Sequence, residues 1–122
     1  MTIKSFENLE VWQLAIELAK IVYRLLETFP KEERFGIIAQ TKNSVVSVSG
    51  NIAEGFGRFH YKDKIKFYYN SRGSLLETKS HLLVSKTIGF VNEGNKELYD
   101  KALSIIEKLG VKLNNYIKSV GR

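Results

Sequence analysis

Apolar side chains recur along this chain at intervals of three and four residues, the spacing of one face of an α-helix. Strand-like alternation of apolar and polar residues is scarce, and the chain has a single proline. The pattern divides into four stretches separated by short connections. We therefore predict helices over about residues 8–29, 31–56, 61–89 and 92–120.

Residue types near the ends of these stretches support the boundaries. Asn8 is a favoured helix N-cap, and the residue before Pro30 avoids helical angles. Pro30 suits the first turn of the second helix, Gly57 suits its end, and Asn92 can cap the fourth. Gly110 lies inside the fourth helix, where it costs about 1 kcal/mol relative to alanine. That glycine predicts a close helix crossing or a bend.

Four helices of roughly 20 to 28 residues with short connections predict an all-α, antiparallel, up-down-up-down four-helix bundle, a single domain over residues 1–122. The absence of cysteine excludes disulfides and thiolate metal sites and fits a reducing cytoplasm. No stretch approaches the roughly 18 uncharged apolar residues of a membrane span, and the first residues do not resemble a signal peptide. We expect a cytoplasmic protein that does not enter the membrane.

The second predicted helix is poor in charge. Between Phe35 and Gly57 only Lys42 and Glu54 are charged, whereas 26% of all residues are charged. A helix with a solvated face would carry more lysine and glutamate. We expect this helix to be buried on most sides, by its own bundle and by another copy of the chain.

Polar residues of the second helix recur at steps of four, three, four, three and four residues, which puts them on one stripe. For Ser44 and Ser47, close packing of small residues between helices is the favoured interpretation. For Asn51 and Glu54 two interpretations stay open: a polar site completed by Arg58, or side chains that satisfy one another between helices. Glu54 needs a partner, because an unpaired buried carboxylate is too costly. The polar stripe consists of Gln40, Ser44, Ser47, Asn51, Glu54 and Arg58.

The formal net charge of +6 is concentrated in the middle of the chain. Residues 34–86 hold nine basic and three acidic side chains, whereas residues 1–33 and 87–122 contribute −2 and +2, which cancel. A local excess of this kind favours binding of a polyanion. Many small basic proteins nevertheless have no nucleic-acid site, so charge alone leaves both interpretations open.

Cations and aromatic rings are interleaved from Phe56 to Arg72. This mixture is typical of nucleic-acid binding, with cations for phosphates and rings for unpaired bases. All the cations before Arg72 are expected to face solvent. The residues predicted to contact phosphates are Arg58, Lys62, Lys64, Lys66 and Arg72.

Not every ring of this segment is expected at the surface, because some positions belong to the apolar face of the third helix. Arg72 falls inside that apolar arc. It either extends to solvent or meets a carboxylate, for which Glu54 is a candidate. The predicted core face comprises Ile65, Tyr68, Tyr69, Leu75, Leu76, Leu82 and Leu83.

Residues that usually build active sites are not assembled in this sequence. The turn Gly55–Arg58 lacks the Gly-Lys-Ser/Thr of a phosphate-binding loop, and no strand precedes it. His60 and His81, the two histidines, are not spaced as metal ligands. Catalysis by Glu54 would need a closed polar pocket around it and Asn51. We expect a non-enzymatic protein with no catalytic residue, no metal and no cofactor.

Three motifs, in order along nearly the whole chain, carry a resemblance to a known family. They are Phe6-Glu7-Asn8-Leu9-Glu10-Val11-Trp12-Gln13, Asn51-Ile52-Ala53-Glu54-Gly55-Phe56-Gly57-Arg58, and Gly73-Ser74-Leu75 with Glu77. The chain resembles the four-helix-bundle proteins of bacterial 23S ribosomal RNA intervening sequences. It departs from the family pattern at Thr41-Lys42-Asn43, which lacks an arginine, and at Val48-Ser49-Gly50, which lacks a proline.

The resemblance implies a cytoplasmic all-α bundle that assembles as a ring-like homo-oligomer, a homopentamer. Members of the family look like relatives of the accessory bundle protein of diversity-generating retroelements, which binds nucleic acid and a reverse transcriptase. Two hypotheses follow. The chain forms an oligomeric bundle that associates with RNA, or it forms a scaffold whose ring docks a protein partner such as a reverse transcriptase.

Overall fold

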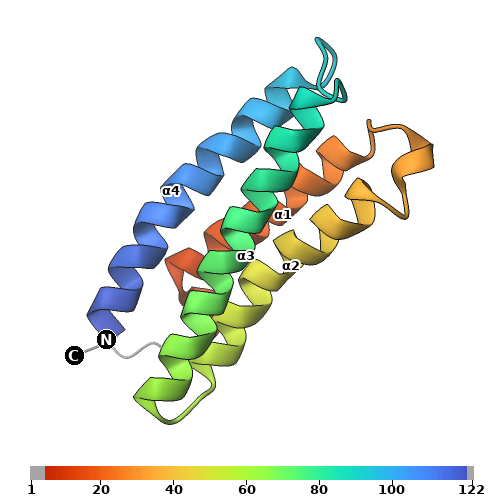
Figure 1. Cartoon of the computed structure of the whole chain (residues 1–122). Helices are drawn as coiled ribbons and strands as arrows, with labels where there is room; N and C mark the ends of the chain where they lie inside the picture. Colours follow the sequence, from red (N-terminus) through yellow and green to blue (C-terminus); the bar gives the residue numbers. More distant parts are fainter. Residues whose placement is uncertain (1–4, 121–122) are drawn as a thin grey trace.

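Four helices lie side by side in the computed structural model, which describes residues 5–120 (Figure 1). α1 spans Glu10–Leu26, α2 Ile37–Phe56, α3 Tyr61–Thr87 and α4 Lys96–Val120. Short 3₁₀ helices at Phe6–Asn8 and Lys31–Glu33 precede α1 and α2. The prediction of an all-α four-helix bundle is confirmed. Within residues 5–120, no helix is both long enough and apolar enough to cross a membrane.

Helices that follow one another in the chain run antiparallel. Between α2 and α3, Ser44 pairs with Thr78 and Ser47 pairs with Ser74, so the partner number falls as the α2 number rises. α1 and α3 each contact both α2 and α4. The four helices therefore enclose one core, with the up-down-up-down path that Figure 1 traces from red to blue.

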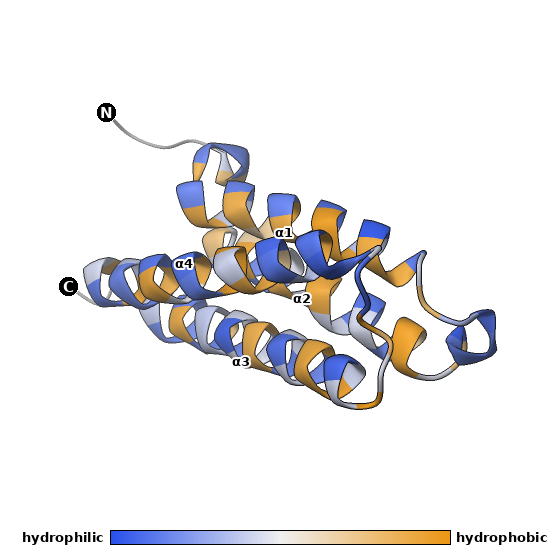
Figure 2. Ribbon diagram, turned by 90° about the horizontal axis from the view of Figure 1, so that it is seen from above, coloured by the Kyte–Doolittle hydropathy of each residue, from blue (hydrophilic) through white to orange (hydrophobic). Residues whose placement is uncertain are grey.

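The core runs along the bundle and takes side chains from every helix. Figure 2 shows the apolar faces of the helices turned toward one another. Residues at helical spacing fill it, among them the fully buried Leu18, Val45, Leu82 and Leu109. Complete burial of one such side chain stabilises a fold by about 1.5–3 kcal/mol. Periodicity alone therefore explains most of the packing.

Small hydroxyl side chains build the contact between α2 and α3. Ser44 Oγ and Thr78 Oγ1 share a hydrogen bond of 2.8 Å, and Ser47 Oγ and Ser74 Oγ share one of 2.9 Å. Ser71 Oγ donates to a main-chain carbonyl of α2 at 2.7 Å. We call these five residues the hydroxyl seam. The predicted role of Ser44 and Ser47 in close packing between helices is confirmed.

A further close approach between α2 and α3 lies at Gly55. A Cβ added there would be 2.6 Å from Cε1 of Tyr68, so the ring would have to move. Tyr68 is buried, its hydroxyl lies 3.3 Å from that of Tyr116 on α4, and burial raises its pKa. Of the close crossing or bend predicted at Gly110, the close crossing is absent, because a Cβ there would meet Leu75 at an ordinary 3.9 Å.

The first two helices begin later than predicted. α1 begins after Leu9, because Asn8 already belongs to the preceding 3₁₀ helix and is not the N-cap. Lys31–Glu33 form a separate 3₁₀ turn and not the first turn of α2. α2 begins at Ile37, since the backbone of Gly36 (φ −107°, ψ −116°) leaves the helical region.

Two asparagines hold the connection between α3 and α4. Asn92 Oδ1 accepts the N–H groups of Gly94 at 2.8 Å and of Asn95 at 3.2 Å, so Asn92 shapes the turn and α4 begins only at Lys96. Asn95 is buried and donates from Nδ2 to Thr28 Oγ1 at 2.8 Å and to a main-chain carbonyl of the turn at 2.9 Å. The turn is thereby tied to the end of α1.

Gly55→Ala should lower the free energy of unfolding by about 1–2 kcal/mol, because overpacking against the buried Tyr68 ring outweighs the helix propensity that alanine restores. Gly110→Ala is the matched control inside a helix. Its Cβ would make ordinary contact, so this variant should be more stable by about 0.5–1 kcal/mol. Chemical denaturation measures both changes, and a Gly55→Ala protein as stable as the parent would contradict the close approach.

Candidate nucleic-acid interface

The exposed cations predicted to contact phosphates gather where α2 turns into α3. Arg58 lies in the turn of residues 57–60, at the lower end of the bundle in Figure 1. Lys62 and Lys66 follow in the first turns of α3, four residues apart and therefore on one face of the helix. We call Arg58, Lys62 and Lys66 the basic tip.

Arg58 and Lys66 lie over the same aromatic ring. The Arg58 guanidinium carbon is 4.7 Å and the Lys66 ammonium nitrogen 6.0 Å from the centroid of Phe67. Arg58 also forms an ion pair of 2.9 Å with Glu54, and both side chains are about half exposed. An exposed pair of this kind contributes little to stability. Two cations lie on one ring and Arg58 is paired with a carboxylate, which leaves a positive potential that favours an anion.

Lys64 is held by the end of α2 and is not part of the basic tip. Its ammonium group donates to the main-chain carbonyls of Phe56 at 2.9 Å and Gly55 at 3.4 Å, at the end of α2. The last carbonyls of a helix have no partner within the helix and carry its negative dipole end, which attracts a cation. Lys64 is half-buried in this position, so the expectation that it faces solvent is wrong.

Arg72 also lies apart from the basic tip. Its guanidinium group donates to Oδ1 of Asn114 on α4 at 3.0 Å and lies 4.8 Å from the centroid of Tyr69. It therefore lines the groove between α3 and α4. The pairing with Glu54 suggested from the sequence is wrong, because Glu54 pairs with Arg58.

The apolar face predicted for α3 is buried only in part. Tyr68, Leu75 and Leu82 are buried in the core, as predicted. Other residues of the predicted face are exposed. The hydroxyl seam occupies the side of α3 that faces α2, so part of the apolar face of α3 is turned toward solvent. We call these exposed residues, spaced by seven residues, the α3 row; they are Tyr69, Leu76 and Leu83.

The turn itself exposes two of the rings that the sequence interleaves with cations, although neither was proposed as a site residue. Phe59 is 89% exposed, and its ring meets the ring of His60 edge-on at 5.1 Å. Tyr61, the first residue of α3, is 50% exposed. Periodicity assigned neither ring to a helix face, because both lie at the junction between two helices. Their place in that junction was the signal available in the sequence.

The polar stripe of α2 does not converge on one site. Gln40 is exposed near the start of the helix. Asn51 Nδ2 donates to the carbonyl oxygen and to Oγ of Ser47, both at 2.9 Å, and so extends the hydroxyl seam. Glu54 and Arg58 satisfy each other at the surface. These contacts join residues within α2 and the turn that follows it, so neither the convergent polar site nor the pairing between helices that the sequence left open for Asn51 and Glu54 is seen in them.

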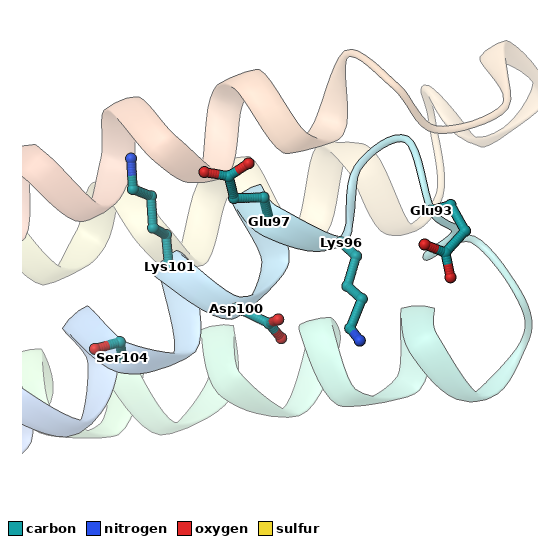
Figure 3. Close-up of a pocket in the computed structure, with 6 residues that line it drawn as sticks. All are labelled: Glu93, Lys96, Glu97, Asp100, Lys101 and Ser104. Atoms are coloured by element: carbon teal, nitrogen blue, oxygen red, sulfur yellow. The ribbon is translucent and has the colours of Figure 1, made fainter.

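A shallow hollow on α4 has nearly balanced charge. Figure 3 shows Glu97 and Lys101 on one side of the α4 ribbon and Lys96 and Asp100 on the other. Among residues 5–120, no three His, Cys, Asp or Glu side chains are grouped so that they could hold a metal ion. The residues that line the hollow are Glu93, Lys96, Glu97, Asp100, Lys101 and Ser104.

Comparison with known proteins identifies a family and a similar fold. The family model described as 23S rRNA-intervening sequence protein matches residues 7–115. The chain is similar to a protein of unknown function from the S23 ribosomal protein family of Bacteroides thetaiotaomicron VPI-5482, solved by crystallography at 1.70 Å. That similarity has a TM-score of 0.78 and 20% identity, and covers 88% of this chain and 95% of the other. No curated protein matches the chain.

Lys64→Gln should lower the free energy of unfolding by about 0.3–1 kcal/mol, because the last carbonyls of α2 lose a cation. Lys62→Gln removes the same charge from an exposed position two residues earlier in the chain. It should change the free energy of unfolding by less than about 0.5 kcal/mol. Chemical denaturation at low salt compares the two variants. Equal stability of both would mean that Lys64 does not hold the end of α2.

Proposed function

Since the chain belongs to the family of 23S rRNA-intervening sequence proteins, we propose that it is a non-enzymatic, cytoplasmic, homo-oligomeric helical bundle that associates with RNA through its basic tip. The observation that carries this proposal is the gathering of Arg58, Lys62 and Lys66 at one exposed turn. These three differ from the other two cations expected to contact phosphates. Within residues 5–120, Lys62 and Lys66 are exposed and form no ion pair, and Arg58 lies partly exposed in its ion pair with Glu54.

Local charge supports a polyanion as the ligand. Residues 57–66 contain four cations and one acid, Asp63. One of these cations, Lys64, is committed to the end of α2, and the basic tip supplies the other three. Cations that meet phosphates release condensed counterions, which gives sequence-independent affinity that falls as salt rises. The proposed contact is therefore with the RNA backbone and carries no base specificity of its own.

Exposed apolar residues support self-association. Leu76 in the α3 row is 61% exposed, although it lies in the middle of a long helix. Covering a row of apolar side chains with a second surface removes them from water and stabilises the association. We propose that copies of this chain cover the α3 row and form a ring of five, the number that the resemblance to the family implies. Five copies of the 14.0-kDa chain give about 70 kDa.

The alternative function is a protein-interaction scaffold. The observation that favours it is the same α3 row, because an exposed apolar row fits a protein partner such as a reverse transcriptase as well as it fits a second copy. In that case α2 builds the ring, the α3 row docks the partner, and the basic tip is incidental. RNA binding that depends on the tip separates the two functions.

The salt dependence of RNA binding tests the basic tip. The triple variant Arg58→Gln, Lys62→Gln, Lys66→Gln should reduce the slope of log affinity against log salt by about two units, since each lost phosphate contact removes about 0.7 for a single strand. Fluorescence anisotropy with labelled RNA over about 50–200 mM salt measures the slope.

The matched control for this triple variant removes the same formal charge from α4. Lys96→Gln, Lys101→Gln, Lys108→Gln changes three exposed lysines away from the tip and should leave the slope nearly unchanged. Equal effects of the two triple variants would mean that net charge matters and the tip does not. An absence of RNA binding in the parent protein would refute the proposed function and favour the scaffold.

The mass of the assembly tests self-association. Sedimentation equilibrium should give about 70 kDa for the parent protein and about 14 kDa for Leu76→Lys, Leu83→Lys, because charges on the α3 row cannot be buried without partners. Helix content should be equal in both. Tyr23→Lys changes an exposed ring on α1 and should keep the parent mass. A monomeric parent protein would contradict the proposal.

A further inference from the structure

The turn between α2 and α3 joins exposed rings to exposed cations. Phe59 is 89% and Tyr61 50% exposed, and Arg58 and Lys62 of the basic tip lie immediately before and after them in the chain. Gly57–His60 belong to neither helix, so no helix face is available to bury Phe59. A phenylalanine that gains no burial within its own chain adds nothing to the stability of the fold. Its exposed ring therefore offers a flat apolar surface to a ligand.

The cations restrict the chemistry of that ligand. Arg58 and Lys66 lie over Phe67, and Lys62 follows Tyr61 directly, so a molecule seated on the exposed rings also meets positive charge. A purely apolar partner would have to desolvate these cations without compensation. A double helix offers phosphates but keeps its bases stacked inside, out of reach of the rings. Unpaired nucleotides offer both a base plane and a phosphate at every step.

The opposite end of the bundle provides an internal comparison. Phe35 is 86% exposed, and the guanidinium carbon of Arg34 lies 5.1 Å from its ring centroid. Glu32 and Glu33 stand just before this pair and offset its charge. An exposed ring beside an arginine thus occurs at both ends of the bundle, but an excess of positive charge accompanies it only at the α2–α3 turn.

We propose that the basic tip takes an unpaired segment of RNA, with Phe59 and Tyr61 as stacking surfaces for two bases and Arg58, Lys62 and Lys66 as contacts for the adjoining phosphates. This inference rests on the proposed function and adds to it the class of RNA. Stacking on aromatic side chains tolerates any base, so the surface recognises unpaired structure without a fixed sequence.

The test compares a labelled, unstructured RNA of about 12 nucleotides with a blunt, fully paired RNA duplex of about 12 base pairs, both at about 100 mM salt. The parent protein should bind the unstructured RNA more tightly. Phe59→Ser, Tyr61→Ser should weaken that binding about 100-fold, or about tenfold for each lost stacking contact, and should leave binding of the duplex unchanged. The salt slope should also stay unchanged, because no charge is removed.

Two further variants separate stacking from loss of structure. Phe35→Ser removes an equally exposed ring from the other end and should bind both RNAs as the parent does. Phe59→Trp keeps a stacking surface, so it should retain the affinity, and its added indole fluorescence should be quenched by the unstructured RNA. Circular dichroism checks that helix content is the same in all variants.

The outcomes separate the failure of this inference from the failure of the proposed function. A parent protein that binds the fully paired duplex as tightly as the unstructured RNA overturns the inference and leaves the proposed function standing. The same conclusion follows if Phe59→Ser, Tyr61→Ser behaves like Phe35→Ser. A parent protein that binds neither RNA refutes the proposed function, and the inference with it.

Discussion

The hydroxyl seam between α2 and α3 is the contact on which the rest of the bundle depends. One hydrogen bond contributes about 0.5–1.5 kcal/mol net, but a buried hydroxyl without a partner costs about 1–3 kcal/mol. The penalty for a wrong register therefore exceeds the gain from any one bond. A shift of α3 by one turn would separate Ser44 from Thr78 and Ser47 from Ser74 together. Within residues 5–120, every buried side-chain nitrogen or oxygen has a partner.

The seam also decides what the surface of the bundle looks like. Small side chains bring α2 and α3 together, Gly55 admits the ring of Tyr68, and Lys64 closes the end of α2. These contacts fix the short turn that carries Phe59 and the basic tip. On the other side of α3 they leave the apolar α3 row uncovered. A polar contact inside the bundle thus exposes both a ring-and-cation surface at the turn and an apolar row along the helix.

Periodicity was sufficient to predict four helices and most of the core, because burial of apolar stripes is the largest favourable contribution to folding. It was less reliable where a side chain has a choice of partners. Lys64 and Lys66 look alike in sequence, but only Lys64 reaches the carbonyls that end α2. Gly55 and Gly110 both lie inside helices. The ring of Tyr68 leaves no space for a Cβ at Gly55, whereas Gly110 has room for one. For Asn92 and Asn95, burial against Thr28 decided which side chain became part of the interior. Such choices depend on distances that spacing along the chain does not contain.

The bond between Thr28 and Asn95 joins residues 67 apart in the chain, whereas seam contacts join residues 23 to 34 apart. Contacts between nearby residues form sooner, and closing a longer loop costs more chain entropy. We therefore expect the α2–α3 hairpin to assemble first, with α4 closing against α1 last. During synthesis the α2–α3 hairpin leaves the ribosome before α4 does. The turn with its rings and cations is then presented to its surroundings while the remainder of the chain is still being made.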